Sequence, residues 1–410
     1  MISVSGSYIE VLKRRDFLAL TLMVFFGQMA SALLILSLIV SVFSQTGSTF
    51  GVSGVVLSFT IPAFLLMVFA GLAADIFDRK KIMIVAYCAT SLVVLFILIT
   101  GQAVAASIPL SFVYFAGNTF FIPSSSAATA QVVKREQLLV ANSIFIFTLS
   151  TALLAGFFLA SVIHFFFGST VTLSVCLALL LLSIILGVTL PKLEPLRQNH
   201  PTLAKKIKNI LSGFKFVMKS KTVWYFFSIF VLIQGLVFFA VTLAPEFFSE
   251  IVGIPIDKSP ILVMPLIGLG VVIGSIFVHR PELSEGLLIS IGLSIVGMVS
   301  VLLGLALMLD LIIGSLLLVY IVFGLIFLGF GAVIIMVAAR TVIQKKVPHS
   351  NLGIVFAASM IATSFLSAVL SPLAALLEAT IGFVNIFVYG GLLLLVISAT
   401  YAYLGNRWKF

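Results

Sequence analysis

Residues 71–81 read Gly71-Leu-Ala-Ala-Asp-Ile-Phe-Asp-Arg-Lys-Lys81, and they lie between two long apolar runs, residues 50–74 and 82–101. Only 9% of the chain is charged, yet five of the seven positions from Asp75 to Lys81 are charged. Because a charged side chain is costly inside hydrocarbon, this segment is expected to face water at a membrane surface. Lys and Arg beside a span mark the cytoplasmic side, so the pattern predicts a short cytoplasmic loop.

The rest of the chain is apolar enough to span a membrane many times. It is 62% hydrophobic with a mean hydropathy of +1.32, against about half apolar in soluble domains. A helix of about 20 apolar residues crosses the ~30 Å hydrocarbon core. Such long runs do not fit the alternating pattern of barrel strands, so we predict an all-α membrane protein with twelve transmembrane helices. The twelve runs are residues 17–43, 50–74, 82–101, 107–130, 138–163, 169–190, 222–248, 260–278, 286–309, 311–338, 351–377 and 381–404.

The net charge of +10 follows from this topology. With both termini in the cytoplasm, all of the 23 Lys and Arg except Lys258 fall on the cytoplasmic side, as the positive-inside rule requires. We therefore expect a multi-pass protein of the cell's inner membrane and no nucleic-acid partner. The basic face is expected to attract anionic membrane lipids.

The longest polar stretch, residues 191–221, divides the predicted spans into six and six. We predict an N-terminal six-helix bundle over 1–190, a cytoplasmic linker over 191–221 and a C-terminal bundle over 222–410. Segments Val133–Leu138 and Val347–Leu352 lie 214 residues apart and enter the following spans at matching places, which indicates duplicated halves.

The linker contains a basic amphipathic pattern that is typical of a helix in the membrane interface. A calmodulin-target helix is the alternative interpretation. The apolar positions are Leu203, Ile207, Ile210, Leu211, Phe214 and Val217, and the lysines are Lys205, Lys206, Lys208, Lys215 and Lys219.

The charged loop resembles the signature loop of the major facilitator superfamily, with matching residues at Gly71, Asp75, Arg79, Lys80 and Lys81. The resemblance implies two pseudo-symmetric six-helix bundles. It also implies that these five residues form a conformational switch. The sequence departs from the family pattern at Ala73, Ile76 and Asp78.

Asp75 is expected at the C-terminal end of a helix, where the helix dipole is already negative. This unfavourable interaction would be offset either by Arg79 or by the N-terminus of another helix packed nearby. In the family the matching Asp is thought to cap a helix of the opposite half. In this sequence that helix begins at residues 348–351. That cap would favour the outward-open state. The alternative is that the loop only fixes orientation and packing.

A second segment resembles two branches of this family. Lys134–Leu138 followed by Ala141-Asn-Ser143 resembles the exporters of macrolides, tetracyclines and siderophores, and also the lysophospholipid transporters. The first branch implies export of drug-like compounds, and the second implies movement of lipids.

Three carboxamides lie near mid-depth: Gln28, Asn118 and Gln234 in spans one, four and seven. The resemblance implies that spans one, four, seven and ten surround a central cavity. Span ten contributes Tyr320, and Tyr114 lies one turn before Asn118 on the same face of span four. We predict that these five residues bind the substrate. The alternative is that the amides only join helices. Neutral polar groups in an apolar cavity suit an amphipathic or lipophilic solute, whereas a strongly anionic solute would require Arg or Lys there.

No Asp or Glu lies mid-span, so proton coupling has only end-of-helix candidates. Glu246 and Glu378 are the two we consider, and each is otherwise a solvated carboxylate at a helix end. The sequence holds no phosphate-binding glycine loop, metal motif or catalytic constellation, so we predict no cofactor, no metal and no enzymatic activity.

The sequence thus predicts a monomeric secondary transporter that exports lipophilic or amphipathic small molecules by alternating access, coupled by hypothesis to protons. The first alternative is a lysophospholipid or phospholipid flippase on the same fold. The second is a membrane scaffold or receptor that does not transport.

Overall fold

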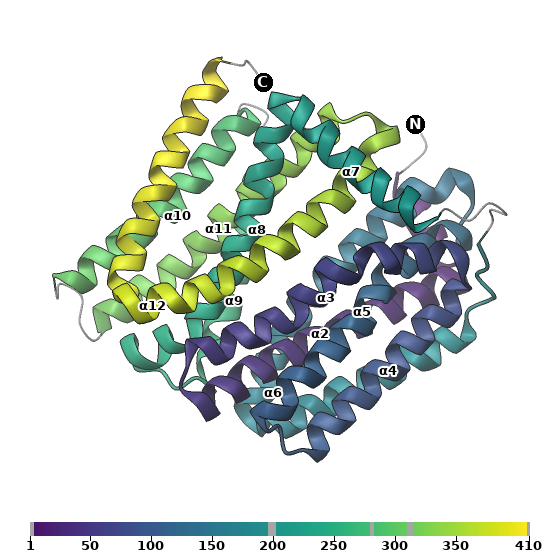
Figure 1. Ribbon diagram of the computed structural model, residues 1–410, viewed down its shortest axis with the longest axis horizontal. Helices are drawn as coiled ribbons and strands as arrows, with labels where there is room; N and C mark the ends of the chain where they lie inside the picture. Colours follow the sequence, from purple (N-terminus) through teal and green to yellow (C-terminus); the bar gives the residue numbers. More distant parts are fainter. Residues whose placement is uncertain (1–3, 196–201, 279–282, 310–314, 408–410) are drawn as a thin grey trace. The chain divides into compact units, whose positions relative to one another are not determined.

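The computed structural model describes residues 4–195, 202–278, 283–309 and 315–407, and every element within them is helical. Two short turns, the 3₁₀ helix η1 (Arg135–Gln137) and the π-helix η2 (Phe247–Ile251), accompany the α-helices (Figure 1). The α-helices are α1 (Val4–Leu12), α2 (Arg15–Thr46), α3 (Thr49–Ile76), α4 (Arg79–Ile99), α5 (Val104–Val132), α6 (Leu138–Thr189), α7 (Leu203–Lys219), α8 (Lys221–Glu246), α9 (Ser259–Phe277), α10 (Glu285–Met308), α11 (Ser315–Lys346) and α12 (His349–Arg407).

Ten helices of the described chain, α2 to α6 and α8 to α12, are long and apolar enough to cross a membrane. Many of their large apolar side chains are exposed, among them Ile99, Phe167 and Ile276 at 70%, 66% and 72%. An exposed apolar surface of this extent suits hydrocarbon and not water. The predicted all-α class and membrane character are confirmed.

Two of these elements are longer than one crossing needs. α6 has 52 residues and α12 has 59, and each consists of two helices joined at a glycine. Gly168 has φ 79° and Gly382 has φ 74°, a conformation that glycine adopts without a steric penalty. Figure 1 shows α12 reversing its direction along the chain. Each glycine therefore forms a corner between two helices.

The two corners repeat with the spacing found in the sequence. Gly382 follows Gly168 by 214 residues, which is also the separation of Val133 and Val347. Each corner lies inside the last long helical element of its half of the chain. This shared register supports the internal repeat.

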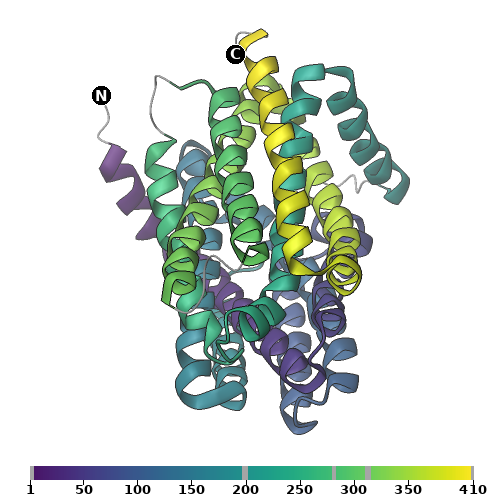
Figure 2. The same ribbon diagram turned by 90° about the vertical axis from the view of Figure 1, so that its left-hand side faces the viewer.

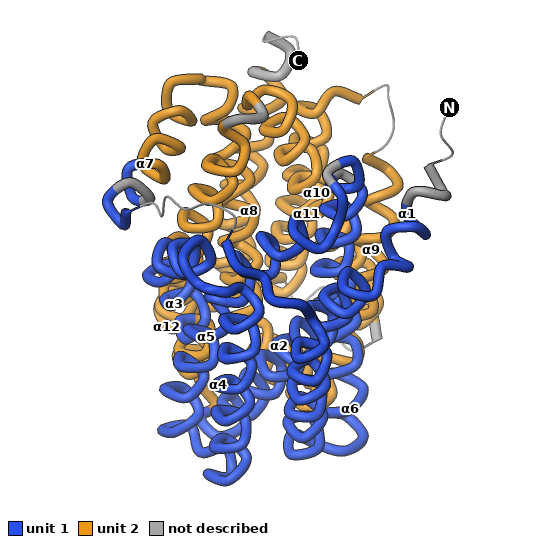
Figure 3. The backbone as a smooth tube through the Cα atoms, turned by 90° about the vertical axis from the view of Figure 1, so that its right-hand side faces the viewer, with its two compact units in different colours: residues 1–46, 57–208 blue, residues 47–56, 209–410 orange. Residues whose placement is uncertain are grey.

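The helices group into two compact units, coloured separately in Figure 3. Unit 1 comprises residues 1–46 and 57–208, and unit 2 comprises residues 47–56 and 209–410. The start of α3 thus groups with unit 2 and the rest of α3 with unit 1. The boundary between the halves falls inside α7.

In unit 1, α2 is the most enclosed helix. It packs against α6 and α5, and α4 packs against the same two helices. Its buried residues include Met23, Leu33 and Leu34, each at 0% exposure. Because α2 contacts protein on most sides, any polar side chain on it must find a protein partner or a bound molecule.

In unit 2, the core is built from α8, α10, α11 and α12. Figure 2 shows the final part of α12 (yellow) running beside green helices of this unit, and α10 is its principal neighbour. Aliphatic and aromatic side chains fill this core, among them Phe226, Ile289, Ile334 and Val355.

Candidate solute and coupling sites

A cluster of polar side chains lies inside unit 1, where α2, α4 and α5 meet. Ser31 of α2 donates to the carbonyl of Gly27 at 3.2 Å, which leaves its oxygen free to accept from Tyr114 of α5 at 3.1 Å. Gln28 of α2 is 4% exposed and Tyr114 is 1% exposed, while Asn118 of α5 is half-buried. The structure therefore brings three of the predicted substrate residues into one region.

Tyr87 of α4 completes this cluster, although it was not among the residues predicted from the sequence. A Cβ at Gly27 would lie 1.8 Å from the Tyr87 hydroxyl, so the absence of a side chain at Gly27 lets Tyr87 reach α2 beside Gln28. The Tyr87 ring stacks on Phe121, with centroids 4.2 Å apart. Phe121 lies about one turn after Asn118 on α5, so Tyr87 contacts both of the helices that carry the two amides.

Three atoms of this unit 1 cluster have no hydrogen-bond partner among the described residues: Gln28 Nε2, Tyr87 Oη and Asn118 Oδ1. A buried polar atom without a partner costs about 1–3 kcal/mol. Native proteins keep few such atoms, and in membrane helices they mark ligand or water sites. The set supplies an amide donor, a hydroxyl and a carbonyl acceptor, which suits an uncharged polar group.

The other two predicted substrate residues lie in unit 2. Gln234 is half-buried on α8, beside Gly235, which approaches Leu366 and Leu370 of α12. Tyr320 of α11 donates to the Val299 carbonyl of α10 at 2.7 Å, so its hydroxyl already has a protein partner.

A group of carboxyls gathers at one end of unit 2, which we call the acidic end. Glu246 closes α8, Glu250 lies in η2 and Glu378 lies on α12, four residues before the Gly382 corner. Glu246 interacts electrostatically with both Glu250 and Glu378. Thr49, at the start of α3, also donates its hydroxyl to Glu246. Two ionised carboxylates repel each other, so their proximity favours a proton on one of them.

The charged loop of unit 1 is bound tightly to its own unit. Asp78 caps α4 by accepting from the Lys80 amide at 2.9 Å, and it also accepts from the Leu193 amide at 3.2 Å. Lys80 donates to the carbonyls of Val188 and Leu190 at the end of α6. Lysine at a helix C-terminus satisfies carbonyls that have no partner within the helix.

The remaining switch residues lie around this contact. Arg79 donates to the Ala74 carbonyl at 3.1 Å and interacts electrostatically with Asp75. Gly71 is half-buried on α3, and Lys81 is exposed on the first turn of α4. The predicted partner of Asp75 on another helix involves His349 and Ser350, whose side chains lie outside the described residues.

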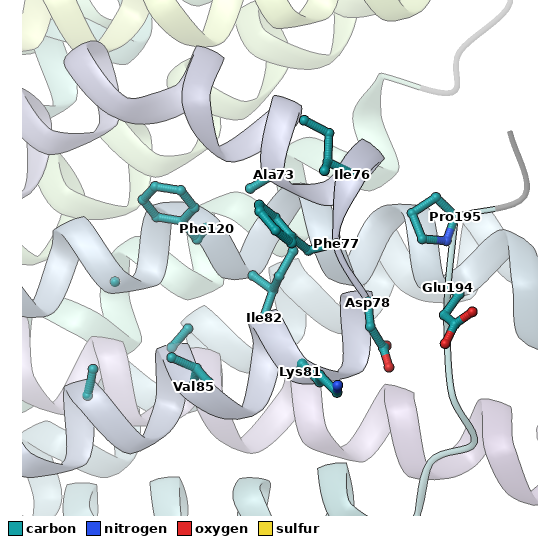
Figure 4. Close-up of a pocket in the computed structure, with 13 residues that line it drawn as sticks. Ala73, Ile76, Phe77, Asp78, Lys81, Ile82, Val85, Phe120, Glu194 and Pro195 are labelled. Atoms are coloured by element: carbon teal, nitrogen blue, oxygen red, sulfur yellow. The ribbon is translucent and has the colours of Figure 1, made fainter. Parts of the chain in front are cut away.

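A cavity of about 790 Å³ lies beside this loop in unit 1, lined by apolar residues of α3, α4 and α5. Figure 4 shows the charged tips of Asp78, Lys81 and Glu194 at one end, with Val85 and Phe120 further along. Its size is that of a small-molecule site. Gln28, Tyr114 and Asn118 are not among its lining residues.

α7 presents two apolar surfaces and one basic surface. Val217 is fully buried, and Phe214 packs edge-on against Phe227 of α8 at 6.2 Å. Ile207, Leu211 and Met218 are exposed and share a neighbouring face at helical spacing. The exposed lysines Lys208, Lys215 and Lys219 flank that face.

The fold and these sites define a class: a helical multi-pass membrane protein built for transport. Its sequence matches the Major Facilitator Superfamily over residues 17–372, and the chain belongs to that family. No group of three His, Cys, Asp or Glu residues able to hold a metal occurs in the part of the chain that the structure describes.

Solved structures with similar folds are transporters. The nucleoside transporter NupG, in a mutant form, has a TM-score of 0.73 at 13% identity and covers 94% of this chain and 99% of its own. The POT family transporter PepTSo has a TM-score of 0.74 at 12% identity, with coverage of 97% and 98%.

A bacterial homolog of the human lysosomal transporter Spinster, in an inward-facing unoccupied conformation, has a TM-score of 0.68 at 14% identity, with coverage of 96% and 97%. At such identities the similarity establishes the fold alone. A search of curated protein sequences found no match.

Proposed function

We propose that this protein is a secondary transporter that moves an amphipathic small molecule across the membrane by alternating access. Twelve crossings in two six-helix bundles would arise from the ten long helices and their two glycine corners. The observation that carries the proposal is the polar cluster of unit 1, with unpartnered atoms of Gln28, Tyr87 and Asn118 inside an apolar bundle.

The chemistry of this cluster indicates the kind of solute. An apolar body would be favoured by the surrounding aromatic and aliphatic side chains, such as Phe121. A few neutral donors and acceptors would then orient a single polar group. A sugar or a nucleoside needs many more hydrogen bonds than this cluster supplies, so we favour lipophilic and amphipathic compounds. Export of drug-like compounds is the direction and substrate that we propose.

The test compares Asn118→Leu with Asn385→Leu in proteoliposomes loaded with a fluorescent lipophilic dye. Asn118 has an oxygen without a partner among the described residues, whereas Asn385 is half-buried and donates to the Ile381 carbonyl of its own helix. We expect dye movement to fall in the first variant and to stay near wild type in the second. Equal activity in the two variants would contradict the proposed solute site.

We further propose that proton movement drives transport through Glu246 and Glu378. The support is the electrostatic interaction between the two carboxyls, because a carboxyl pair that holds one proton can take up or lose protons as its surroundings change. Thr49 couples the pair to the start of α3, a helix that continues into unit 1.

Glu246→Gln and Glu378→Gln are expected to abolish transport driven by a pH gradient while exchange of solute persists. Glu285→Gln is the matched control, since Glu285 pairs with Lys345 on other helices of unit 2. Unchanged pH-driven transport in both acidic-end variants would remove the coupling proposal and leave the solute proposal intact.

A lipid transporter is the second candidate function, and the cavity in Figure 4 favours it. Its apolar walls suit an acyl chain and its charged end suits a head group. Filling it with Ala89→Phe should slow the movement of a fluorescent lysophospholipid and spare the dye, if lipid is the substrate. Slowing of neither would leave the cavity without a transport role.

We also propose that the membrane is the cell's inner membrane, with both termini in the cytoplasm, and that the protein acts as a monomer. α7 would lie in the interface with anionic lipids, because its exposed apolar face is flanked by Lys208, Lys215 and Lys219.

A further inference from the structure

Arg340 lies inside a membrane-spanning helix. The tenth apolar run predicted from the sequence ends at residue 338, whereas α11 continues to Lys346. Arg340 is half-buried six residues before the helix ends, about 9 Å along its axis at the rise of an α-helix. An ionisable group at such a position is rarely without a role, because an apolar surrounding opposes its charge.

The guanidinium of Arg340 stacks on an aromatic ring and has no other partner in the described chain. Its central carbon lies 5.3 Å from the centroid of Phe356, near the start of α12. A ring covers one face of the planar guanidinium and leaves the N–H groups at its edge able to donate. Those donors fit a carboxylate or a phosphate in a forked geometry.

The carboxylates of unit 2 that the structure describes do not supply that anion. Glu285 binds Lys345 at 2.6 Å. Glu246, Glu250 and Glu378 gather at the acidic end, at the far end of α8 from Lys221. Arg340 therefore remains without an ionic partner among the described residues.

The surroundings of Arg340 carry excess positive charge. Lys221, Lys345 and Lys346 lie at the same end of unit 2, which we call the basic end. α7, with its exposed lysines, packs against this end of α12, where Gly213 approaches Ile354 closely. Clustered cations raise the local concentration of anions and favour their binding.

We propose that Arg340 and Phe356 form a binding site for the anionic head, a carboxylate or a phosphate, of an amphipathic molecule. The inference rests on the proposed function and narrows its substrate class: the protein would take acidic amphiphiles, whose apolar part lies among aromatic and aliphatic side chains. A strongly anionic solute was expected to require Arg or Lys in the cavity, and Arg340 supplies an arginine within a long apolar helix. The anion has two sources, a transported solute or a membrane lipid.

The experiment uses the full-length protein in phosphatidylcholine nanodiscs, with dodecyl phosphate as the anionic probe and dodecyl maltoside as the neutral one. The midpoint of thermal unfolding is followed against probe concentration. In Arg340→Gln the half-saturating concentration of dodecyl phosphate should rise about tenfold, since a hydrogen-bonded charge is lost. The response to dodecyl maltoside should not change.

Two further variants keep the test sharp. Lys345→Gln removes a cation from the same end and leaves Arg340 in place, so its half-saturating concentration of dodecyl phosphate should rise much less than that of Arg340→Gln. Arg340→Lys keeps the charge but loses the forked geometry of the guanidinium, so it should bind dodecyl phosphate with intermediate affinity. If Arg340→Gln does not fold, Arg340→Lys is the variant that is compared with wild type. Wild-type affinity in both Arg340 variants would overturn the proposal.

Nanodiscs that contain phosphatidylglycerol separate the two sources. If a lipid occupies the site, phosphatidylglycerol raises the unfolding midpoint of the wild type but not of Arg340→Gln, and dodecyl phosphate then adds nothing. If a solute occupies it, dodecyl phosphate still acts. Failure of anion binding together with normal transport of a neutral dye would reject this inference alone. Absence of transport for amphiphiles of every charge would reject the proposed function instead.

Discussion

The interiors of the two units differ in kind. Unit 1 encloses hydroxyl and amide groups between α2, α4 and α5, and some of their atoms lack partners among the described residues. Unit 2 encloses an extended apolar core and pairs some buried hydroxyls across helices, as Thr242 does with Ser371 and Ser290 with Ser398. The hydroxyls of Thr363 and Ser367 lack partners among the described residues, but no buried side-chain amide does so in unit 2. Ionisable groups of unit 2 lie toward its two ends, with Arg340 near the basic end and Glu246, Glu250 and Glu378 at the acidic end.

This difference indicates a division of tasks between the two units. Neutral polar groups can select a solute without the large desolvation cost of a charge. Charged groups near the ends of spans can reach water and therefore exchange protons or anions. We infer that unit 1 contributes recognition of the neutral part of the solute, while unit 2 contributes ionic chemistry.

The largest effect is expected from closing the space that Tyr87 occupies. In Gly27→Ala the new Cβ would lie 1.8 Å from the Tyr87 hydroxyl, and the ring is held by its stack on Phe121. Overpacking of this kind costs about 1–3 kcal/mol, so the unfolding midpoint should fall. Gly268→Ala, which meets nothing within 4 Å, should equal or exceed wild-type stability. Comparable stability in the two variants would contradict the close packing of Tyr87 against Gly27.

A second experiment separates satisfied from unsatisfied hydroxyls within the unit 1 cluster. Tyr114→Phe removes a bond to Ser31 and should cost about 1 kcal/mol of unfolding free energy. Tyr87→Phe removes a hydroxyl without a partner in the described chain, so its stability should hold while dye transport falls. If Tyr87→Phe lost stability and kept transport, the hydroxyl would be structural.

A smaller effect is expected at the charged loop. Asp75→Asn removes a carboxylate whose proposed helix cap is worth about 0.3–1 kcal/mol, so the population should move toward the inward-open state. Accessibility of introduced cysteines to a thiol reagent would measure the shift. Asp78→Asn is the control, because Asn caps α4 about as well as Asp. If cysteine accessibility were unchanged in Asp75→Asn, the loop would have a packing role and no role in the conformational switch.

The smallest effect concerns α7, which crosses the boundary between the units. Replacing Lys208, Lys215 and Lys219 together by Gln should reduce the anionic lipid that purifies with the protein, as measured by mass spectrometry. The loss should be partial, because Lys221, Lys345 and Lys346 remain. Lys258→Gln is the control, because Lys258 is predicted to lie on the opposite side of the membrane. If the triple variant retained as much anionic lipid as Lys258→Gln, α7 would not face the lipid surface.

The charged loop and the spacing of apolar runs predicted much of the fold, because hydrocarbon demands about 20 apolar residues for each helix. Side-chain neighbours were harder to predict. Tyr87 escaped attention because an apolar span without periodicity does not show which face meets α2. Glu246 and Glu378 were chosen separately, and only tertiary structure joins them.

Arg340 was missed for a different reason, the placement of a helix end. A long side chain can carry its charge toward the interface, so a helix remains in the membrane past its last apolar residue. Hydropathy alone therefore ends such a span too early. An Arg within two turns of a predicted helix end is the signal that would have found it.

The glycine corners at residues 168 and 382 also bear on how this protein can be handled. The chain turns there with almost no intervening loop, so an epitope tag or a protease site inserted at either corner would disrupt the adjoining helical hairpin.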